Sequence, residues 1–476
     1  MGSVRRFARV SALAVGAALV AASALAGATP AAAAPGDIPV TFADTGDSGS
    51  FYPTVEILLG SDPDPYTVVL DTGSEALVMY SPVAGAVATG ATASVTYVGS
   101  SVVGTVSTAD FSIGGNTATG INFLDGSGCT GCAMPGIDGV LGISQGLDEA
   151  IDSGTSTTVK WYSPFLQFDD TTLSAGHTLN FGDTSGTLTL GAPAAAGSST
   201  TVLLAAAVTG LSYPNSAAYP VYEKPIDLCW QIEQESVCQA TTIDTGAPGG
   251  IVAGAAFAPY AHITSPTTAT TQTKIGHLHA GTSVAFAAST GATSFASWLA
   301  VDSGPGSFSV YNTITDGHLN TGNKFFLGRT VGYDYATGQI RVTANAAAPS
   351  APATVSTTSS SDGLLSAIWA DLESVTVTDR LVRVRDSSGA VVQRFNLPGS
   401  ATSTDISGLD PAQTYTVDIA SANKYGISAY RSASPAAARA PRLPDTGFEL
   451  APWTILASLL LGAGALTLTA NRRTRA

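Results

Sequence analysis

Two copies of the tripeptide Asp-Thr-Gly are the residues of this 476-residue chain with the clearest capacity for chemistry: Asp71-Thr72-Gly73 and Asp244-Thr245-Gly246. One such tripeptide is ordinary turn chemistry, but two in separate halves of a chain can bring two carboxylates together. Two carboxylates about 3 Å apart cannot both ionise cheaply, so they share a proton. The ionised member can then take a proton from a water molecule, and the protonated member can donate one to a carbonyl oxygen.

The elements that must position these carboxylates are expected to be β-strands. Each tripeptide follows a short β-type run and enters a glycine turn, and the chain contains 51 Gly together with much Ser, Thr, Val and Ala. This composition is typical of many short strands and turns. We therefore predict an all-β region over residues 35–345. Its two related lobes, about 38–190 and 191–345, each present one carboxylate at a shared axis.

Further stretches give residues 38–345 a resemblance to the pepsin-like aspartic proteases. Val95-Thr96-Tyr97 resembles the flap hairpin of that family. The segment from Ile137 to Gly142 and Phe325-Phe326-Leu327-Gly328 resemble the hydrophobic-hydrophobic-Gly segments that back the two catalytic loops. The resemblance implies a bilobal pepsin-like fold with Asp71 and Asp244 as the catalytic dyad.

The resemblance also assigns roles to the residues around the dyad. It implies a lid over the substrate at Tyr97, for which an ordinary strand aromatic is the alternative. The implied supporting residues are Thr72 and Thr245 as a clasp between the lobes, Gly73 and Gly246 for close backbone approach, and Ser74 as a hydrogen-bond donor to Asp71.

Two positions depart from the family pattern. Ala247 follows the second Asp-Thr-Gly where Ser or Thr is usual, which removes a donor that would stabilise ionised Asp244. Val78 stands where the family has a Trp partner for the flap tyrosine. These departures motivate an alternative function, a catalytically weak or inactive pepsin-like surface protein used for binding or adhesion.

The cysteines and two histidines have simpler readings. Cys129-Thr130-Gly131-Cys132 spells a redox-type CxxC, but outside the cell we expect a structural disulfide. Cys229 and Cys238 are expected to close a β-hairpin before the second motif. His277 and His279 alternate like a metal-ligand pair, yet no nearby Cys, Asp or Glu completes a site, so we predict a solvated strand face and no metal.

Both ends of the chain are expected to lie outside the fold. Residues 1–34 read as a secretory signal, with a basic start, an apolar stretch and small-residue cleavage sites. We expect no long propeptide after it. At the other end, an apolar segment over 453–470 and a basic tail follow the pentapeptide Leu443-Pro444-Asp445-Thr446-Gly447. Residues 441–476 resemble the LPxTG sorting signal of Gram-positive surface proteins, which implies cleavage by a sortase after Thr446 and covalent attachment to the cell wall. The alternative is a single-pass membrane anchor.

Residues 346–440 begin with an Ala- and Pro-rich linker and continue with strand-like alternation. The stretch from Gly408 to Tyr415 and on to Gly426 resembles a fibronectin type III module, with Trp369 and Tyr415 at its core aromatics. We expect a small β-sandwich here that spaces or presents its neighbour.

The charge balance excludes one class of partner. The formal net charge is -15, and residues 35–345 contain 6 basic and 25 acidic residues. Nucleic-acid binding needs a basic surface and is not expected.

Taken together, the motifs and resemblances predict a secreted, cell-wall-anchored aspartic endopeptidase. It is expected to be a monomer that acts on protein or peptide substrates without a cofactor and meets the membrane only through its C-terminal segment before sorting.

Overall fold

The computed structural model describes residues 36–438, except for 45–49, 98–99, 133, 215–218, 234, 256, 263–273, 312–318, 362 and 372–375. The expected signal peptide (1–34) and the sorting signal from Leu443 to Gly447 lie outside the described residues. Within them the fold is all-β, without an α-helix and with four short 3-10 helices: η1 (Pro164–Gln167), η2 (Leu173–Ala175), η3 (Ala258–Tyr260) and η4 (Asn323–Phe325). No helix in the described part of the chain is long and apolar enough to cross a membrane.

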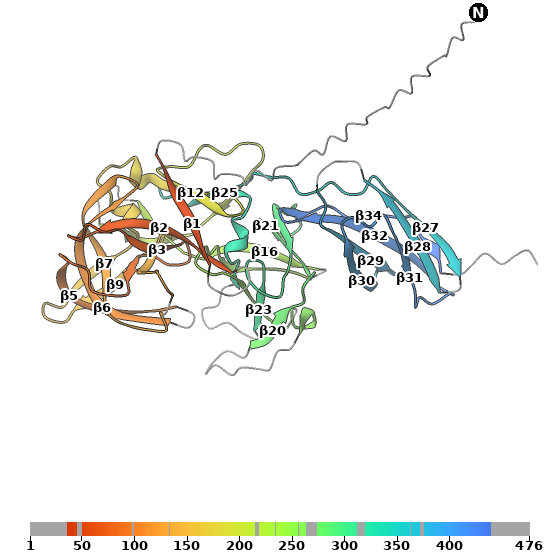
Figure 1. The fold of residues 1–476 in the computed structure, drawn as a ribbon, viewed down its shortest axis with the longest axis horizontal. Helices are drawn as coiled ribbons and strands as arrows, with labels where there is room; N and C mark the ends of the chain where they lie inside the picture. The colour runs from red at the N-terminus through yellow and green to blue at the C-terminus, as the bar shows by residue number, and fades with distance from the viewer. Residues whose placement is uncertain are drawn as a thin grey trace, which may run out of the picture.

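Three parts follow one another along the long axis of the molecule: a first lobe, a second lobe and a C-terminal β-module (Figure 1). The expected fold class, two β-rich lobes followed by a β-sandwich, is thereby confirmed. A 15-stranded sheet builds the first lobe and continues toward the second. Its strands are β1 (Asp37–Asp44), β2 (Phe51–Leu59), β3 (Tyr66–Asp71), β4 (Leu77–Met79), β5 (Val87–Tyr97), β6 (Ser100–Ile113), β7 (Asn116–Thr130), β8 (Gly139–Gly142), β9 (Asp148–Asp152), β10 (Thr157–Trp161), β11 (Gly176–Phe181), β12 (Ser185–Leu190), β13 (Thr200–Leu204), β25 (Arg329–Asp334) and β26 (Gln339–Ala344).

The second lobe is built on a nine-stranded sheet. It consists of β16 (Ile226–Ile232), β17 (Glu235–Thr242), β18 (Gly250–Ala253), β19 (Ala261–His262), β20 (Lys274–Leu278), β21 (Ser283–Ala287), β22 (Ala296–Leu299), β23 (Phe308–Tyr311) and β24 (Leu319–Asn320). A separate pair, β14 (Ala207–Ser212) and β15 (Pro220–Tyr222), precedes it.

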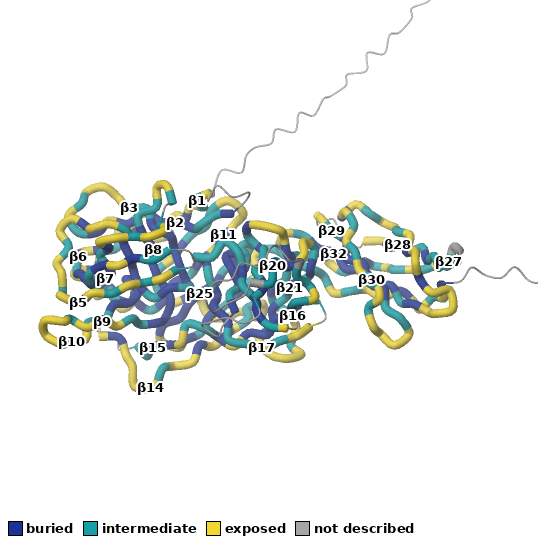
Figure 2. Tube along the Cα trace, turned by 90° about the horizontal axis from the view of Figure 1, so that it is seen from below, coloured by how far each residue is buried: buried dark blue, intermediate teal, exposed yellow. Residues whose placement is uncertain are grey.

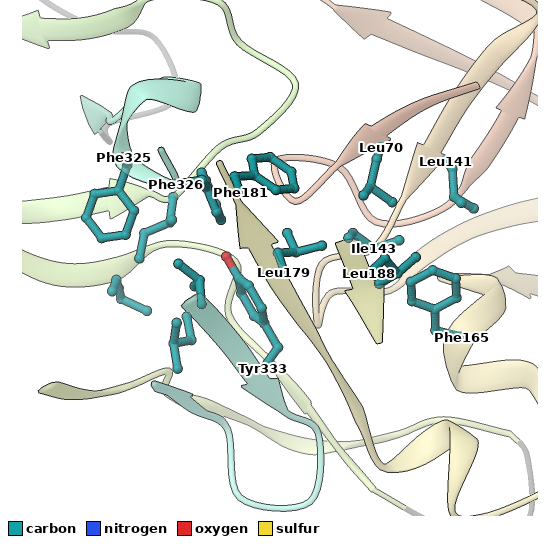
Figure 3. Close-up of a cluster of buried hydrophobic side chains, with 14 of the residues drawn as sticks. Leu70, Leu141, Ile143, Phe165, Leu179, Phe181, Leu188, Phe325, Phe326 and Tyr333 are labelled. Carbon is teal, nitrogen blue, oxygen red and sulfur yellow. The ribbon is translucent and has the colours of Figure 1, made fainter. Parts of the chain in front are cut away.

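The two lobes share strands and a core. The late strand β25 returns to pair with β11, and β26 pairs with β13, so the chain closes onto the sheet of its own first half. One buried apolar cluster runs through both halves. Figure 3 shows Leu70 and Leu141 of the first half in the same cluster as Phe325, Phe326 and Tyr333 of the second. Burial is concentrated in these central strands, whereas the exposed segments lie at the ends and loops (Figure 2). The shared core fixes one lobe relative to the other.

The C-terminal β-module has a core of its own, in which Trp369 and Tyr415 are buried. The Tyr415 hydroxyl accepts a hydrogen bond from the backbone N–H of Asp410 at 2.9 Å, an arrangement typical of β-sandwich domains. One sheet contains β27 (Thr354–Ser361), β28 (Leu364–Ala370) and β31 (Ser403–Ile406). The other contains β29 (Asp379–Arg385), β30 (Val391–Pro398), β32 (Thr414–Asn423), β33 (Gly426–Ile427), β34 (Arg431–Ser432) and β35 (Ala436–Ala437).

The β-module is docked on the second lobe. Arg394 forms an ion pair with Glu233 at 3.0 Å, and the backbone N–H of Ile427 donates to the Ser297 hydroxyl at 3.0 Å. The Tyr425 ring covers Gly328, where an added Cβ would lie 2.6 Å from the ring. A module that served only as a spacer would need none of these contacts. The β-module therefore packs against the second lobe as an integral part of the fold.

Candidate active site

Strand β3 delivers the first carboxylate. It runs parallel to β8, with Asp71 opposite Gly142. A Cβ at Gly142 would lie 2.4 Å from the backbone nitrogen of Ala76, so only glycine lets β8 lie under the loop that follows Asp71. The backbone N–H of Ile143 donates to the Asp71 carbonyl at 2.8 Å, which fixes the end of β3.

The second carboxylate is positioned by the same arrangement in the other half of the chain, a strand paired in parallel with a second strand that leads to a glycine. Strand β17 runs parallel to β24, with Thr242 opposite Asn320. Continuing this register places Gly322 beside Asp244. Gly322 has a φ of 67°, and its Cβ would lie 2.7 Å from the carbonyl carbon of Gly249.

The backing segment of the second loop is therefore 319–322, and our expectation that Phe325-Phe326-Leu327-Gly328 has this role is wrong. Phe325 and Phe326 are buried in the shared core instead, which explains why they carry the expected apolar pattern. A hydrophobic-hydrophobic-Gly segment would have two apolar residues directly before Gly322. This chain has Asn320 and Thr321 there.

The structure brings Asp71 and Asp244 together at the axis between the lobes. A Cβ at Gly73 would lie 2.5 Å from the Asp244 carboxyl carbon, and a Cβ at Gly246 would lie 2.5 Å from that of Asp71. Each loop thus places its glycine against the carboxyl group of the other loop. Any larger residue at either position would push the two carboxyl groups apart.

Reciprocal hydrogen bonds through Thr72 and Thr245 hold the loops in place. The Thr72 hydroxyl accepts from the backbone N–H of Thr245 at 3.0 Å and donates to the carbonyl of Ile243 at 2.8 Å. The Thr245 hydroxyl accepts from the backbone N–H of Thr72 at 2.9 Å and donates to the carbonyl of Leu70 at 2.6 Å. Both threonines are buried. Each of the four bonds joins a threonine hydroxyl to a backbone group of the other half of the chain. Together they fix the position of one carboxylate relative to the other.

Each carboxylate accepts two hydrogen bonds from its own half. Asp71 accepts from the Gly73 backbone N–H at 2.7 Å and from the Ser74 hydroxyl at 2.7 Å. Asp244 accepts from the Gly246 backbone N–H at 2.7 Å and from the Asn320 side-chain amide at 2.6 Å.

The loss of a donor expected from Ala247 therefore does not leave Asp244 without a side-chain partner. Sequence reasoning missed Asn320, which stands with Thr321 at positions of the backing segment where apolar residues are expected.

Burial and a like charge perturb the first carboxyl group. Asp71 is 7% exposed, and desolvation together with the neighbouring Asp244 carboxylate raises the pKa of Asp71 to about 7. The hydrogen bonds from Ser74 and Gly73 oppose this rise. The pair can therefore hold one shared proton at a pH where isolated carboxyl groups are ionised.

Tyr97 ends strand β5 and lies close enough to Asp71 for that carboxylate to raise the pKa of its phenol, although burial is the larger cause. Its hydroxyl is buried, and no residue in the described ranges forms a hydrogen bond with it. The ring packs in a small cluster with Val78 and Trp161. Residues 98–99, which follow Tyr97, lie outside the described residues.

An ion pair stands beside the dyad. Lys224, just after β15, contacts Glu75 of the first loop at 2.9 Å, and both side chains are largely buried. Interactions with Glu75, Asp71 and Asp244 outweigh the cost of burial and raise the pKa of Lys224. Sequence reasoning did not find this pair, because the two residues are far apart in the chain and neither belongs to a motif.

Both expected disulfides are present, Cys129–Cys132 and Cys229–Cys238. The second joins directly opposite residues of the β16–β17 hairpin, the strand pair that leads to Asp244. His277 lies in β20 and His279 just beyond it, and no cluster of three or more potential metal ligands occurs among the residues that the structure describes.

Comparisons with known proteins find similarity among solved structures. No protein-family model matches the chain, and no curated protein matches it either. Among solved structures, the chain is similar to the aspartic proteinase from Irpex lacteus, with 19% sequence identity and a TM-score of 0.45; the match covers 65% of this chain and 97% of that chain. The chemistry of the site is therefore inferred from the geometry of Asp71, Asp244 and their hydrogen-bond donors.

Proposed function

We propose that this protein is an aspartic endopeptidase whose catalytic dyad is Asp71 and Asp244. The observation that carries the proposal is the pair of carboxyl groups held together by the reciprocal threonine bonds, each touching the glycine of the opposite loop. Turn aspartates with a purely structural role would not require two crossed sets of buried hydrogen bonds. They would also gain nothing from a neighbouring carboxylate that opposes ionisation.

The dyad divides the work of hydrolysis between its two members. The ionised carboxylate takes a proton from a water molecule held between the pair, and that water attacks the peptide carbonyl carbon. The protonated carboxyl group donates to the carbonyl oxygen as its charge develops, which gives a tetrahedral gem-diol intermediate. The C–N bond then breaks as the leaving nitrogen takes the proton that the first carboxylate accepted from water, and a hydroxyl proton of the intermediate returns to the second carboxylate, so both members recover their starting states. A peptide would bind in an extended conformation under the β5–β6 hairpin, with Tyr97 above the scissile bond.

We further propose that the enzyme is secreted and attached to a Gram-positive cell wall. The support is the order of sequence features: a stretch typical of a secretory signal at the start, and an LPxTG-type pentapeptide, an apolar segment and a basic tail at the end. Cleavage by a sortase would leave the C-terminal β-module, which resembles a fibronectin type III domain in sequence, between the catalytic region and the wall.

The test is cleavage of a denatured protein by wild type, Asp71→Asn and Asp244→Asn over pH 2 to 8, with and without pepstatin. Both variants are expected to lose at least about 100-fold in rate, because each removes one partner of the acid–base pair. Asp169→Asn is the matched control, since Asp169 is exposed and lies outside the site.

Full activity in either dyad variant would overturn the proposal. A wild-type protein that cleaves neither denatured protein nor a peptide library at any pH would instead favour the alternative, a surface protein that uses the same site for binding.

A further inference from the structure

We propose that Asn320 is the positioning residue of the dyad: it holds Asp244 ionised and so places the shared proton on Asp71. The inference rests on the proposed function and goes beyond it by assigning the two carboxyl groups different roles. Asn320 ends β24, and its amide nitrogen lies 2.6 Å from Oδ2 of Asp244, the carboxylate oxygen that does not accept from the Gly246 backbone N–H.

The orientation of the Asn320 amide is determined by a second hydrogen bond. The backbone N–H of Gly322 donates to Asn320 Oδ1 at 2.8 Å. A backbone N–H cannot accept, so the amide oxygen must face Gly322 and the amide NH2 must face Asp244. Gly322 packs so closely against the backbone of Gly249 and Gly250 that a Cβ would not fit there. The amide is therefore locked as a donor to the carboxylate.

The two halves of the dyad differ in what their side-chain donors can do. Ser74 contacts Asp71 through a hydroxyl, which can donate to an ionised carboxylate or rotate and accept from a protonated one. The Asn320 nitrogen can only donate. A fixed donor favours the charged form of its partner, so the arrangement favours ionised Asp244 and leaves the proton to Asp71.

The other charged and titratable groups around the pair do not provide this asymmetry. Lys224 interacts with both carboxylates, and Tyr333 is close to both. Tyr97 and Tyr80 lie nearer Asp71, and the Glu75 charge is paired with Lys224. Among the side chains of the described site, Asn320 is therefore the one that contacts a single carboxylate and can act only as a donor.

The test compares wild type with Asn320→Leu, which keeps the approximate side-chain volume but removes the donor. In the full-length protein, the acid limb of the pH profile of kcat/KM is expected to move to higher pH by about one to two units. A hydrogen bond to a charged group contributes about 1.5–3 kcal/mol, and one pKa unit corresponds to about 1.4 kcal/mol. Adding Ala247→Thr to Asn320→Leu returns a hydroxyl to the second loop and is expected to reverse at least half of the shift.

Two further variants keep the result interpretable. Asn116→Leu is the matched control, because the Asn116 amide donates only to a carbonyl of its own hairpin. Asn320→Asp is isosteric and guards against misfolding of Asn320→Leu. Above the pKa of the new carboxyl group it would place a second negative charge beside ionised Asp244, so activity above pH 5 is expected to fall about tenfold or more.

A readout independent of activity separates this inference from the proposed function. Carboxyl carbons of the full-length protein, labelled with 13C at Asp, can be titrated by NMR, with Asp244→Asn identifying the Asp244 signal. If wild type cleaves nothing, the proposed function fails, yet a shifted titration in Asn320→Leu still supports the role of Asn320. Unchanged titration curves, or an acid limb that moves less than about 0.3 units and is insensitive to Ala247→Thr, would overturn it.

Discussion

The raised pKa of Asp71 makes a prediction about stability that does not depend on substrate. Because the pKa of the folded-state carboxyl is about 7 against an ordinary value of 3.8, the folded protein binds this proton more tightly than the unfolded chain does. The stability that this proton supplies is fully present below about pH 4 and is lost as the pH rises through 7. Asp71→Asn keeps the shape of the side chain and removes this dependence.

The magnitude follows from the size of the shift. A difference of about three pKa units corresponds to about 4 kcal/mol at 1.36 kcal/mol per unit. This is an upper limit for the pair, since Asp244 contributes part of the shift. We therefore expect Asp71→Asn to match wild type within about 1 kcal/mol at pH 3.5. At pH 7.5 it should be more stable than wild type by up to about 4 kcal/mol.

Urea unfolding at pH 3.5, 5 and 7.5 measures this difference for wild type, Asp71→Asn and the exposed control Asp169→Asn. The control is expected to show a difference of less than about 0.5 kcal/mol that changes little with pH. A gap between wild type and Asp71→Asn that is the same at all three pH values would refute the reasoning. It would mean that the carboxyl group ionises as easily in the fold as in the unfolded chain.

Three further outcomes are expected. Replacing Cys229 and Cys238 by Ser is expected to lower the free energy of unfolding by about 2–3 kcal/mol, measured by urea unfolding, because the lost cross-link closes a short loop. A double-mutant cycle on Glu233 and Arg394 is expected to give a coupling energy of about 0.5–1 kcal/mol that weakens with salt; a coupling of zero would contradict docking of the β-module. Tyr97→Phe is expected to keep or raise stability, since its buried hydroxyl has no partner in the described structure, and to lower kcat, since in the proposed complex that hydroxyl faces the substrate; a loss of stability above about 1 kcal/mol would show that the hydroxyl is satisfied in the fold.

Much of the fold could be predicted because the pattern repeats locally. Short β-type runs before Asp71 and Asp244, and the glycines after them, were enough to predict two β-rich lobes with the carboxylates at their junction. The paired cysteines were equally readable, since each pair is close in sequence. The docking of the β-module could not be predicted from the sequence, because Glu233 and Arg394 are far apart in the chain and neither belongs to a motif.

The sequence by itself determined which residues could act as an acid–base pair, because Asp71 and Asp244 stand in duplicated local motifs that fold in the same way. Only the tertiary structure decided how that pair is completed. Asn320 reaches Asp244 through the parallel pairing of β17 with β24, a contact between residues 76 positions apart. Lys224, just after β15 in the second half of the chain, forms its ion pair with Glu75 in the first half. Donors that replace a missing neighbour from a distant strand leave no local pattern, since their position is set by strand register and by the packing of glycine against backbone.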